Sequence, residues 1–174
     1  MNTKEPTFEE AMNAAMHWCS AWDKGELSDE VLADRISELL TSKNGARGFL
    51  VIGLSSDCPL MDRLPEPLIL QLRKAGKLIV NLTVKNLAMS SAMVVHHKRN
   101  KNTTQEAGSE RVNSRCLELL RLLDPNEVKI SLEELLDDIK EKRNNSELIK
   151  RWGYDDDQQK EIILSIYKVA ENEH

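Results

Sequence analysis

Cys58 has the most suggestive surroundings of any residue in this chain whose type suits catalysis. It lies between Asp57 and Pro59, and a proline at the first helical position would place the thiol at a helix N-terminus, where its pKa is lowered. Arg63 follows five residues later, but a phosphatase loop needs arginine at the next position, which is Leu64, and it needs glycines that expose backbone N–H groups. The pattern therefore favours a structural or modestly reactive thiol over a catalytic one.

His96 and His97 form a second candidate pair, for metal binding or for acid–base chemistry near neutral pH. Adjacent helical residues point about 100° apart, and no acid or cysteine lies within four residues of either histidine. The simpler interpretation is a helix C-terminus, where histidines, Lys98 and Arg99 complement the dipole. An enzyme hypothesis with Cys58 as nucleophile and one of these histidines as base stays open.

Other motifs for catalysis or cofactor binding are absent from the sequence. Gly45, Gly48 and Gly53 match neither a dinucleotide fingerprint nor a phosphate-binding loop, and no zinc-protease or Ser-His-Asp signature is present. The acids 155–157 suit a hard cation but are explained first by capping at the start of a helix. We expect no catalytic site, no metal site and no cofactor.

Cysteine usage and the N-terminal residues indicate a cytoplasmic protein. Cys19, Cys58 and Cys116 are odd in number and widely separated within 174 residues, which favours free thiols in a reducing compartment. Residues 1–10 are acidic and lack an apolar stretch, so we expect no signal or transit peptide and a mature chain that starts here. Lysines at 77, 85 and 98 interrupt the apolar runs, so we expect no membrane insertion.

The elements that must position these residues are predicted to be helices. Apolar residues recur three and four apart in most segments, so the fold class is all-α: a single-domain irregular bundle of six to eight helices over residues 1–174. A helical hairpin is expected at 7–43, with a Thr7/Glu10 capping box, a stop at Gly25, a new start at Ser28 and an end near residues 43–45.

One short apolar segment, 49–54, is ambiguous, because it is continuous and partly β-branched. A lone strand has no partner, so a buried helix or an extended core segment is favoured, and a dimer would be needed to supply a second strand.

The central region, 66–100, is apolar on nearly every side, with Gly76 as a place where it kinks or ends. Such a helix belongs in the middle of a bundle or in an oligomer interface. We take Met89 and Met93, with nearby small residues, as a homodimer surface, and Trp18 and Trp22 as core or interface packing.

The C-terminal region, 105–172, is predicted to hold several helices after a polar loop at 100–109. Capping patterns at Asp124/Glu127 and at Ser131/Glu134 predict a short turn followed by a helix through residue 139. A brief helix is expected at 146–152, and a terminal helix is expected to open at Asp155.

Charge divides the chain into three parts. Residues 1–44 hold 9 acids and 4 bases, residues 45–115 hold 5 and 11, and residues 116–174 hold 15 and 9. The basic middle is either a phosphate-facing patch or is neutralised by acidic helices within the fold. Neutralisation is favoured, because the net charge is −5 and residues 53–151 contain no phenylalanine, tyrosine or tryptophan on which bases could stack. The candidate anion-binding residues are Lys98, Arg99, Lys101, Arg111 and Arg115.

Three segments, 44–49, 57–65 and 84–89, carry a resemblance to a family of small uncharacterised α-helical proteins of cyanobacteria. The likeness covers residues 44–123 and implies no activity and no site residues. The sequence therefore indicates a protein–protein interaction or regulatory module without catalysis, with a protein partner or a second copy as ligand. Phosphate or nucleic-acid binding and a Cys58-dependent enzyme are the alternatives.

Overall fold

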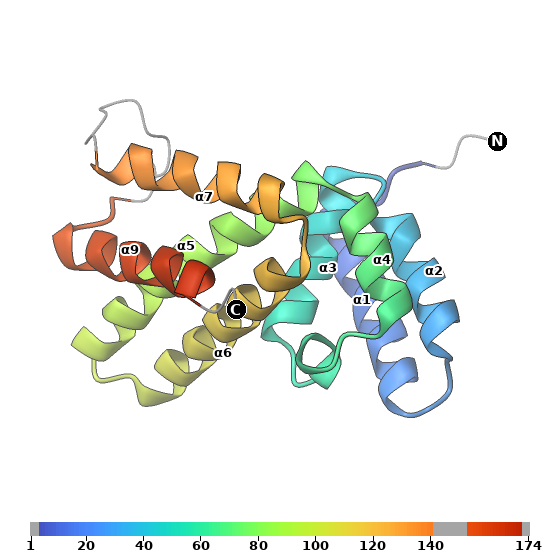
Figure 1. Ribbon diagram of the computed structural model, residues 1–174. Coiled ribbons are helices and arrows are strands. Elements are labelled where there is room, and N and C mark those ends of the chain that lie inside the picture. The colour runs from blue at the N-terminus through green and yellow to red at the C-terminus, as the bar shows by residue number, and fades with distance from the viewer. Residues whose placement is uncertain (1–3, 141–152, 172–174) are drawn as a thin grey trace. The chain divides into compact units, whose positions relative to one another are not determined.

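The computed structural model describes residues 4–140 and 153–171. Within these ranges the chain contains eight α-helices and one 3-10 helix and no strand (Figure 1). The predicted all-α bundle of six to eight helices is therefore confirmed. The chain forms two compact units, unit 1 from Met1–Leu82 with Leu122–Asp124, and unit 2 from Thr83–Arg121 with Pro125–His174. That both units make up a single domain stays a prediction.

Unit 1 begins with a helical hairpin whose ends are capped as the sequence predicts. Thr7 Oγ1 accepts a hydrogen bond from Glu10 N at 3.1 Å, and the Glu10 carboxylate accepts one from Thr7 N at 3.0 Å. Gly25, with φ +77°, ends the first helix, and Ser28 caps the second. The elements of this unit are α1 (Phe8–Asp23), α2 (Asp29–Leu39), α3 (Lys43–Ser55), η1 (Pro59–Asp62), α4 (Glu66–Lys74) and the start of α5 (Lys77–Arg99).

The ambiguous segment 49–54 is helical and buried within α3. The prediction that residues 43–45 end the second helix is wrong, because Ser42 Oγ accepts from Gly45 N at 3.0 Å and these residues begin α3. Gly48 then permits a close approach to α1, since a Cβ there would lie 2.5 Å from Ala11 Cβ. The fully buried Phe49 belongs to the same core.

The central region 66–100 is two helices, because Gly76, with φ +59°, separates α4 from α5. A left-handed backbone favours glycine, and it ends the periodic segment at the place that the sequence marks. Unit 2 contains the rest of α5 with α6 (Thr103–Leu122, all but its last residue), α7 (Pro125–Lys140) and α9 (Asp156–Glu171).

Two boundaries in unit 2 differ from the sequence prediction. The loop expected at 100–109 is only three residues long. Asn102 Oδ1 accepts a hydrogen bond from Gln105 N at 3.1 Å, and this cap starts α6 at Thr103. The expected turn and restart around Ser131 is wrong, because α7 is continuous and Ser131 is buried inside it. Pro125 stands at the first position of α7, which suits its fixed φ and missing donor.

The terminal helix α9 opens as predicted. Asp155 Oδ1 accepts from Gln158 N, and the Gln158 side chain accepts from Asp155 N, both at 3.0 Å. The brief helix predicted at 146–152 lies outside the described residues.

Among the described residues, α5 is the one helix long and apolar enough by length and composition to cross a membrane. Of the 18-residue stretch that meets this test, 61% is buried within the protein. A buried core helix meets the same criteria, so the absence of membrane insertion stays a prediction.

Candidate functional site

An exposed apolar face lies where α7 and α9 pack together in unit 2. Leu164 and Tyr167 of α9 are 54% and 44% exposed, which is high for large apolar side chains, and Ile163 beside them is half-buried. From α7, Lys140 donates a hydrogen bond to Tyr167 Oη at 3.1 Å, and half-buried Leu136 lies one turn before Lys140. These five residues are called the α7–α9 face.

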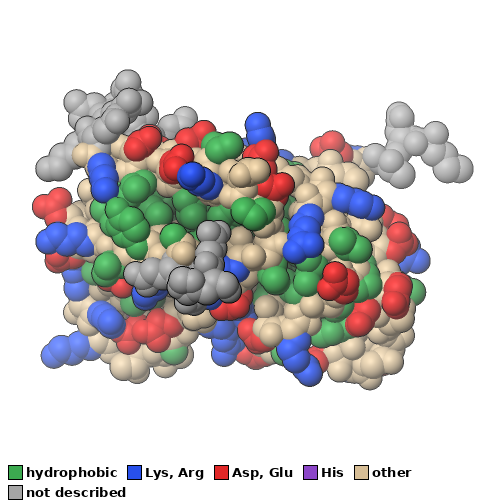
Figure 2. All heavy atoms as spheres, viewed as in Figure 1, with side chains coloured by type: hydrophobic (Ala, Val, Ile, Leu, Met, Phe, Trp, Pro, Cys, Tyr) green, Lys and Arg blue, Asp and Glu red, His purple; other side chains and the backbone are tan. Residues whose placement is uncertain are grey.

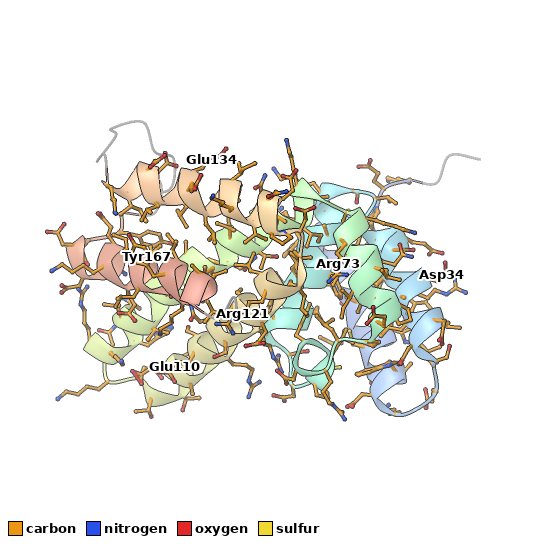
Figure 3. The ribbon with its side chains drawn as sticks, viewed as in Figure 1. Asp34, Arg73, Glu110, Arg121, Glu134 and Tyr167 are labelled. Atoms are coloured by element: carbon orange, nitrogen blue, oxygen red, sulfur yellow. The ribbon has the colours of Figure 1, made fainter. Side chains whose placement is uncertain are left out.

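Figure 2 shows hydrophobic side chains gathered along the line between α7 and α9, and Figure 3 places Tyr167 on the α9 side of it. Lys140 Nζ also lies 5.8 Å from the centre of the Tyr167 ring, a cation–π distance that orients the ring. A contiguous exposed apolar surface rimmed by polar residues is typical of an interaction site.

The rim of the α7–α9 face carries both signs of charge. Glu133 and Asp137 of α7 lie three residues before Leu136 and Lys140, and both are exposed. Lys160 and Lys168 of α9 lie four residues either side of Leu164, and both are exposed. Because residues three and four apart share a helix surface, α7 supplies two acids to the rim beside Lys140, and α9 supplies two lysines beside half-buried Glu161.

The tryptophans and methionines that the sequence assigned to core or interface packing lie in different units. Trp22 Nε1 donates to Asp29 Oδ1 at 2.8 Å, and the Arg35 guanidinium lies 5.5 Å from the Trp18 ring, so both half-buried indoles have contacts within unit 1. In unit 2, Met89 is 40% exposed and Met93 is half-buried. Their role in an interface stays a prediction.

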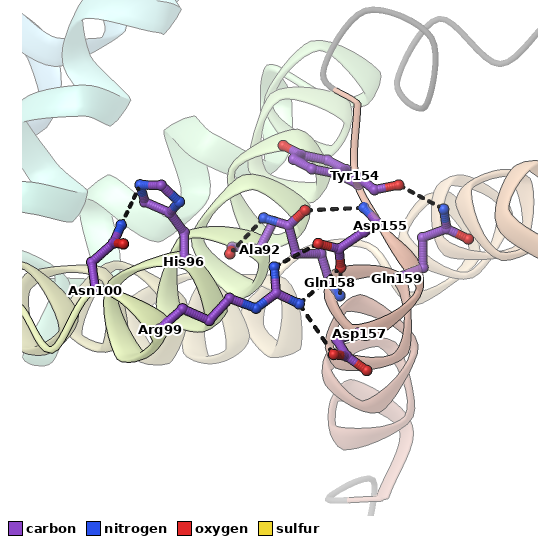
Figure 4. A network of polar contacts seen from close by, with 9 residues as sticks. All are labelled: Ala92, His96, Arg99, Asn100, Tyr154, Asp155, Asp157, Gln158 and Gln159. Atoms are coloured by element: carbon purple, nitrogen blue, oxygen red, sulfur yellow. Dashed lines mark hydrogen bonds and ion pairs between the residues drawn. The ribbon is translucent and has the colours of Figure 1, made fainter.

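The candidate anion-binding residues separate into two groups. Arg99 pairs with Asp155 and Asp157 (Figure 4). Arg115 is only 5% exposed. Lys98, Lys101 and Arg111 are exposed. The structure therefore joins Arg99 to acidic residues at the start of α9, as internal neutralisation requires, and it buries Arg115 away from any solvent-facing patch.

The two histidines lie in the last turn of α5, next to Lys98 and Arg99. Asn100 donates a hydrogen bond to His96 Nε2 at 3.1 Å, and the His96 and His97 ring centres are 5.3 Å apart in an edge arrangement. Across the described ranges, 4–140 and 153–171, no group of three or more His, Cys, Asp or Glu side chains is placed to hold a metal ion.

Cys58 is half-buried and directly precedes η1, and its Sγ donates a hydrogen bond to the Cys19 carbonyl oxygen at 3.5 Å. Burial, together with the charge and hydrogen bonding of the neighbouring Cys58 thiol, raises the pKa of Cys19 to about 12. Cys58 belongs to unit 1 and His96 and His97 to unit 2, so their pairing in catalysis stays a prediction. All three cysteines are thiols, not joined in disulfides.

Sequence reasoning missed a polar cluster inside unit 2 that joins α5, α6 and α9. Asn113 Nδ2 donates to Ser91 Oγ at 2.9 Å and to Ser90 Oγ at 3.1 Å, while Ser91 Oγ and Ser165 Oγ are 2.7 Å apart. The three serines are buried. Ser90 and Ser91 are among the small residues next to Met89 that the sequence assigned to a homodimer surface, but their spacing alone does not indicate Asn113 or Ser165 as partners.

The chain is thus an all-α protein with an exposed apolar face between α7 and α9. A family model matches residues 7–169, and the chain belongs to that family, uncharacterised conserved protein UCP020893. This confirms the resemblance to an uncharacterised family, and the match carries no information on a cyanobacterial origin. Neither a curated protein nor a solved structure matches the chain.

Proposed function

We propose that this chain is a non-catalytic interaction module of the cytoplasm that binds a second copy of itself through the α7–α9 face. The observation that carries the proposal is the exposure of Leu164 and Tyr167 beside one another on α9. Burial of tyrosine and leucine side chains at the centre of an interface stabilises the complex by roughly 25 cal/mol per Å² of apolar area removed from water.

The mixed charge of the rim favours a second copy as the partner. In a two-fold dimer the same surface is used twice, so each residue that meets a partner residue is met in return. If α7 of one protomer lies against α9 of the other, Glu133 and Asp137 meet Lys160 and Lys168 twice. If α7 faces α7 instead, acids meet acids and lysines meet lysines, which costs free energy.

The cytoplasmic location in this proposal rests on three cysteines that form no disulfide, which suits a reducing compartment. The protein is treated as soluble in this proposal because α5 is largely buried by its own chain. Met89 offers an alternative dimer surface. The exposed charge one turn before it is Lys85, so two copies of this surface would bring lysines together.

Phosphate or nucleic-acid binding is the second candidate function. Lys98, Lys101 and Arg111 are the exposed bases that favour it. It is weaker, because Arg99 is engaged by two carboxylates and Arg115 is buried. Its signature is binding to RNA or DNA that weakens steeply as salt rises, and the dimer proposal expects no such binding.

Sedimentation velocity at micromolar concentration tests the dimer. The wild-type chain is expected to sediment as a dimer, and Leu164→Lys as a monomer, because loss of a central contact worth about 2 kcal/mol weakens association roughly 30-fold. Met16→Lys is the matched control, since Met16 in α1 of unit 1 is also 54% exposed. A wild-type monomer, or dissociation in the control alone, contradicts the proposal.

A further inference from the structure

Two thiols that are 39 residues apart in sequence come together in unit 1. Cys19 is 1% exposed and fixed within α1, whereas Cys58 is half-buried in the segment before η1. The Cys58 Sγ lies 3.5 Å from the carbonyl oxygen of Cys19, and α1 and η1 are in contact. Neither the sequence spacing nor the family match assigns a role to this pair.

The Cys58 side chain also lies near enough to the Cys19 thiol to affect its pKa. After burial, which is the largest cause, the charge of Cys58 and its hydrogen bond with the Cys19 thiol raise the pKa of Cys19. Cys116 in unit 2 is equally buried, and burial is the one cause that raises its pKa to about 12. The chain therefore contains one close thiol pair and one isolated buried thiol.

We propose that Cys58 and Cys19 form an oxidisable dithiol site that hydrogen peroxide converts into an intramolecular disulfide. Cys58 reacts first because it is the more exposed of the two. Its thiolate attacks one peroxide oxygen, the O–O bond breaks, and Cys58 sulfenic acid and one water result once the leaving hydroxide takes a proton.

The second step joins the two cysteines. The Cys19 sulfur attacks the Cys58 sulfur, the S–O bond breaks, and the departing hydroxide leaves as water with the Cys19 thiol proton. Two thiols thus lose two hydrogens and two electrons, and one peroxide becomes two waters. A disulfide needs the two Cβ atoms about 4 Å apart. We expect Cys58 to move toward Cys19 when the bond forms, because Cys58 lies outside any regular α-helix.

Peroxide treatment of the full chain, followed by non-reducing peptide mapping and intact mass, tests this proposal. The expected result is a Cys19–Cys58 linked peptide, a mass lower by two hydrogens, and reversal by dithiothreitol. The Cys116→Ser variant is expected to form the same link, and Cys58→Ser is expected to form no intramolecular link.

The proposal is overturned if Cys58 of the wild-type chain proceeds to the sulfinic acid, or links to a second chain, while Cys19 remains reduced. This result needs no substitution, so it holds even where Cys58→Ser fails to fold. The outcome is independent of the α7–α9 dimer, because the thiol pair lies in unit 1.

Discussion

Arg99, in the last turn of α5, holds Asp155, the residue that caps α9, through both terminal nitrogens of its guanidinium. The same carboxylate accepts a hydrogen bond from Gln158 N at 3.0 Å. Gln158 in turn donates through its side chain to the Ala92 carbonyl oxygen at 3.2 Å (Figure 4). One aspartate therefore both starts α9 and fixes its first turn against α5.

This arrangement predicts a pH dependence of stability. The hydrogen bonds from Arg99 and then from the backbone of Gln158 lower the pKa of Asp155 to about 2, below an unfolded value of about 3.9. A lowered folded-state pKa gives stabilisation that is present above pH ~4 and lost as the pH falls toward 2. Asp155→Asn is therefore expected to lower the Tm at pH 7, and its deficit relative to wild type is expected to shrink with acid. A deficit that is constant with pH contradicts this account.

The control for that experiment is Asp156→Asn, in the next residue, which is exposed and outside the Arg99 ion pairs. Its Tm is expected to follow the wild type over the same pH range. Thermal unfolding followed by circular dichroism is the measurement in both cases.

Two glycines on helices are expected to respond oppositely to alanine. A Cβ at Gly48 would lie 2.5 Å from Ala11 Cβ and 2.8 Å from Met12 N, whereas a Cβ at Gly108 would meet nothing within 4 Å. Gly48→Ala is expected to destabilise the protein by about 1–3 kcal/mol through overpacking. Gly108→Ala is expected to stabilise it by up to ~1 kcal/mol through helix propensity. Urea unfolding gives both values, and equal effects would be inconsistent with the α1–α3 approach.

The polar cluster of unit 2 predicts a large effect from one amide. Asn113→Ala removes the donor to Ser90 and Ser91 and is expected to cost about 1–3 kcal/mol, because buried hydroxyls lose a partner. Ser114→Ala, one residue along α6 and exposed, is expected to change stability by less than about 0.5 kcal/mol. Chemical denaturation compares the two, and a mild effect at 113 would mean that the cluster does not specify packing.

Thiol reactivity is expected to separate the three cysteines. Burial raises the pKa of Cys116 to about 12, and burial with the adjacent Cys58 does the same for Cys19, so both stay protonated and shielded at pH 8. Iodoacetamide is expected to modify Cys58 first in the native protein, as peptide mass spectrometry would record. Reaction of Cys58 well below pH 8.5 would instead revive the enzyme hypothesis.

Local signals predicted much of the fold. The Thr7/Glu10 box, Gly25, Ser28 and Asp155 each mark a helix boundary through short-range hydrogen bonds. A capping pattern can also occur inside a helix, and this caused one error. Ser131 and Glu134 have the spacing of a capping box, but they lie within the continuous helix α7, where Ser131 is buried in unit 2.

The candidate site was harder to predict, since it depends on contacts between distant segments. The contact between Lys140 and Tyr167, and that between Cys19 and Cys58, join residues 27 and 39 positions apart. Amphipathic spacing places Tyr167 on an apolar stripe of α9, but it does not say whether a neighbouring helix covers that stripe. Charge counting did indicate internal neutralisation, of which the Arg99 pairs are an instance.

Charge reversal with mixing of variants is the most direct test of the α7–α9 dimer. One variant carries Lys160→Glu with Lys168→Glu, and the other carries Glu133→Lys with Asp137→Lys. Each alone places like charges across the proposed two-fold interface and is expected to sediment as a monomer. Mixed in equal amounts they restore both sets of opposite charges, so a dimer is expected to reappear. Dimers of either variant alone, or monomers in the mixture, would contradict the account.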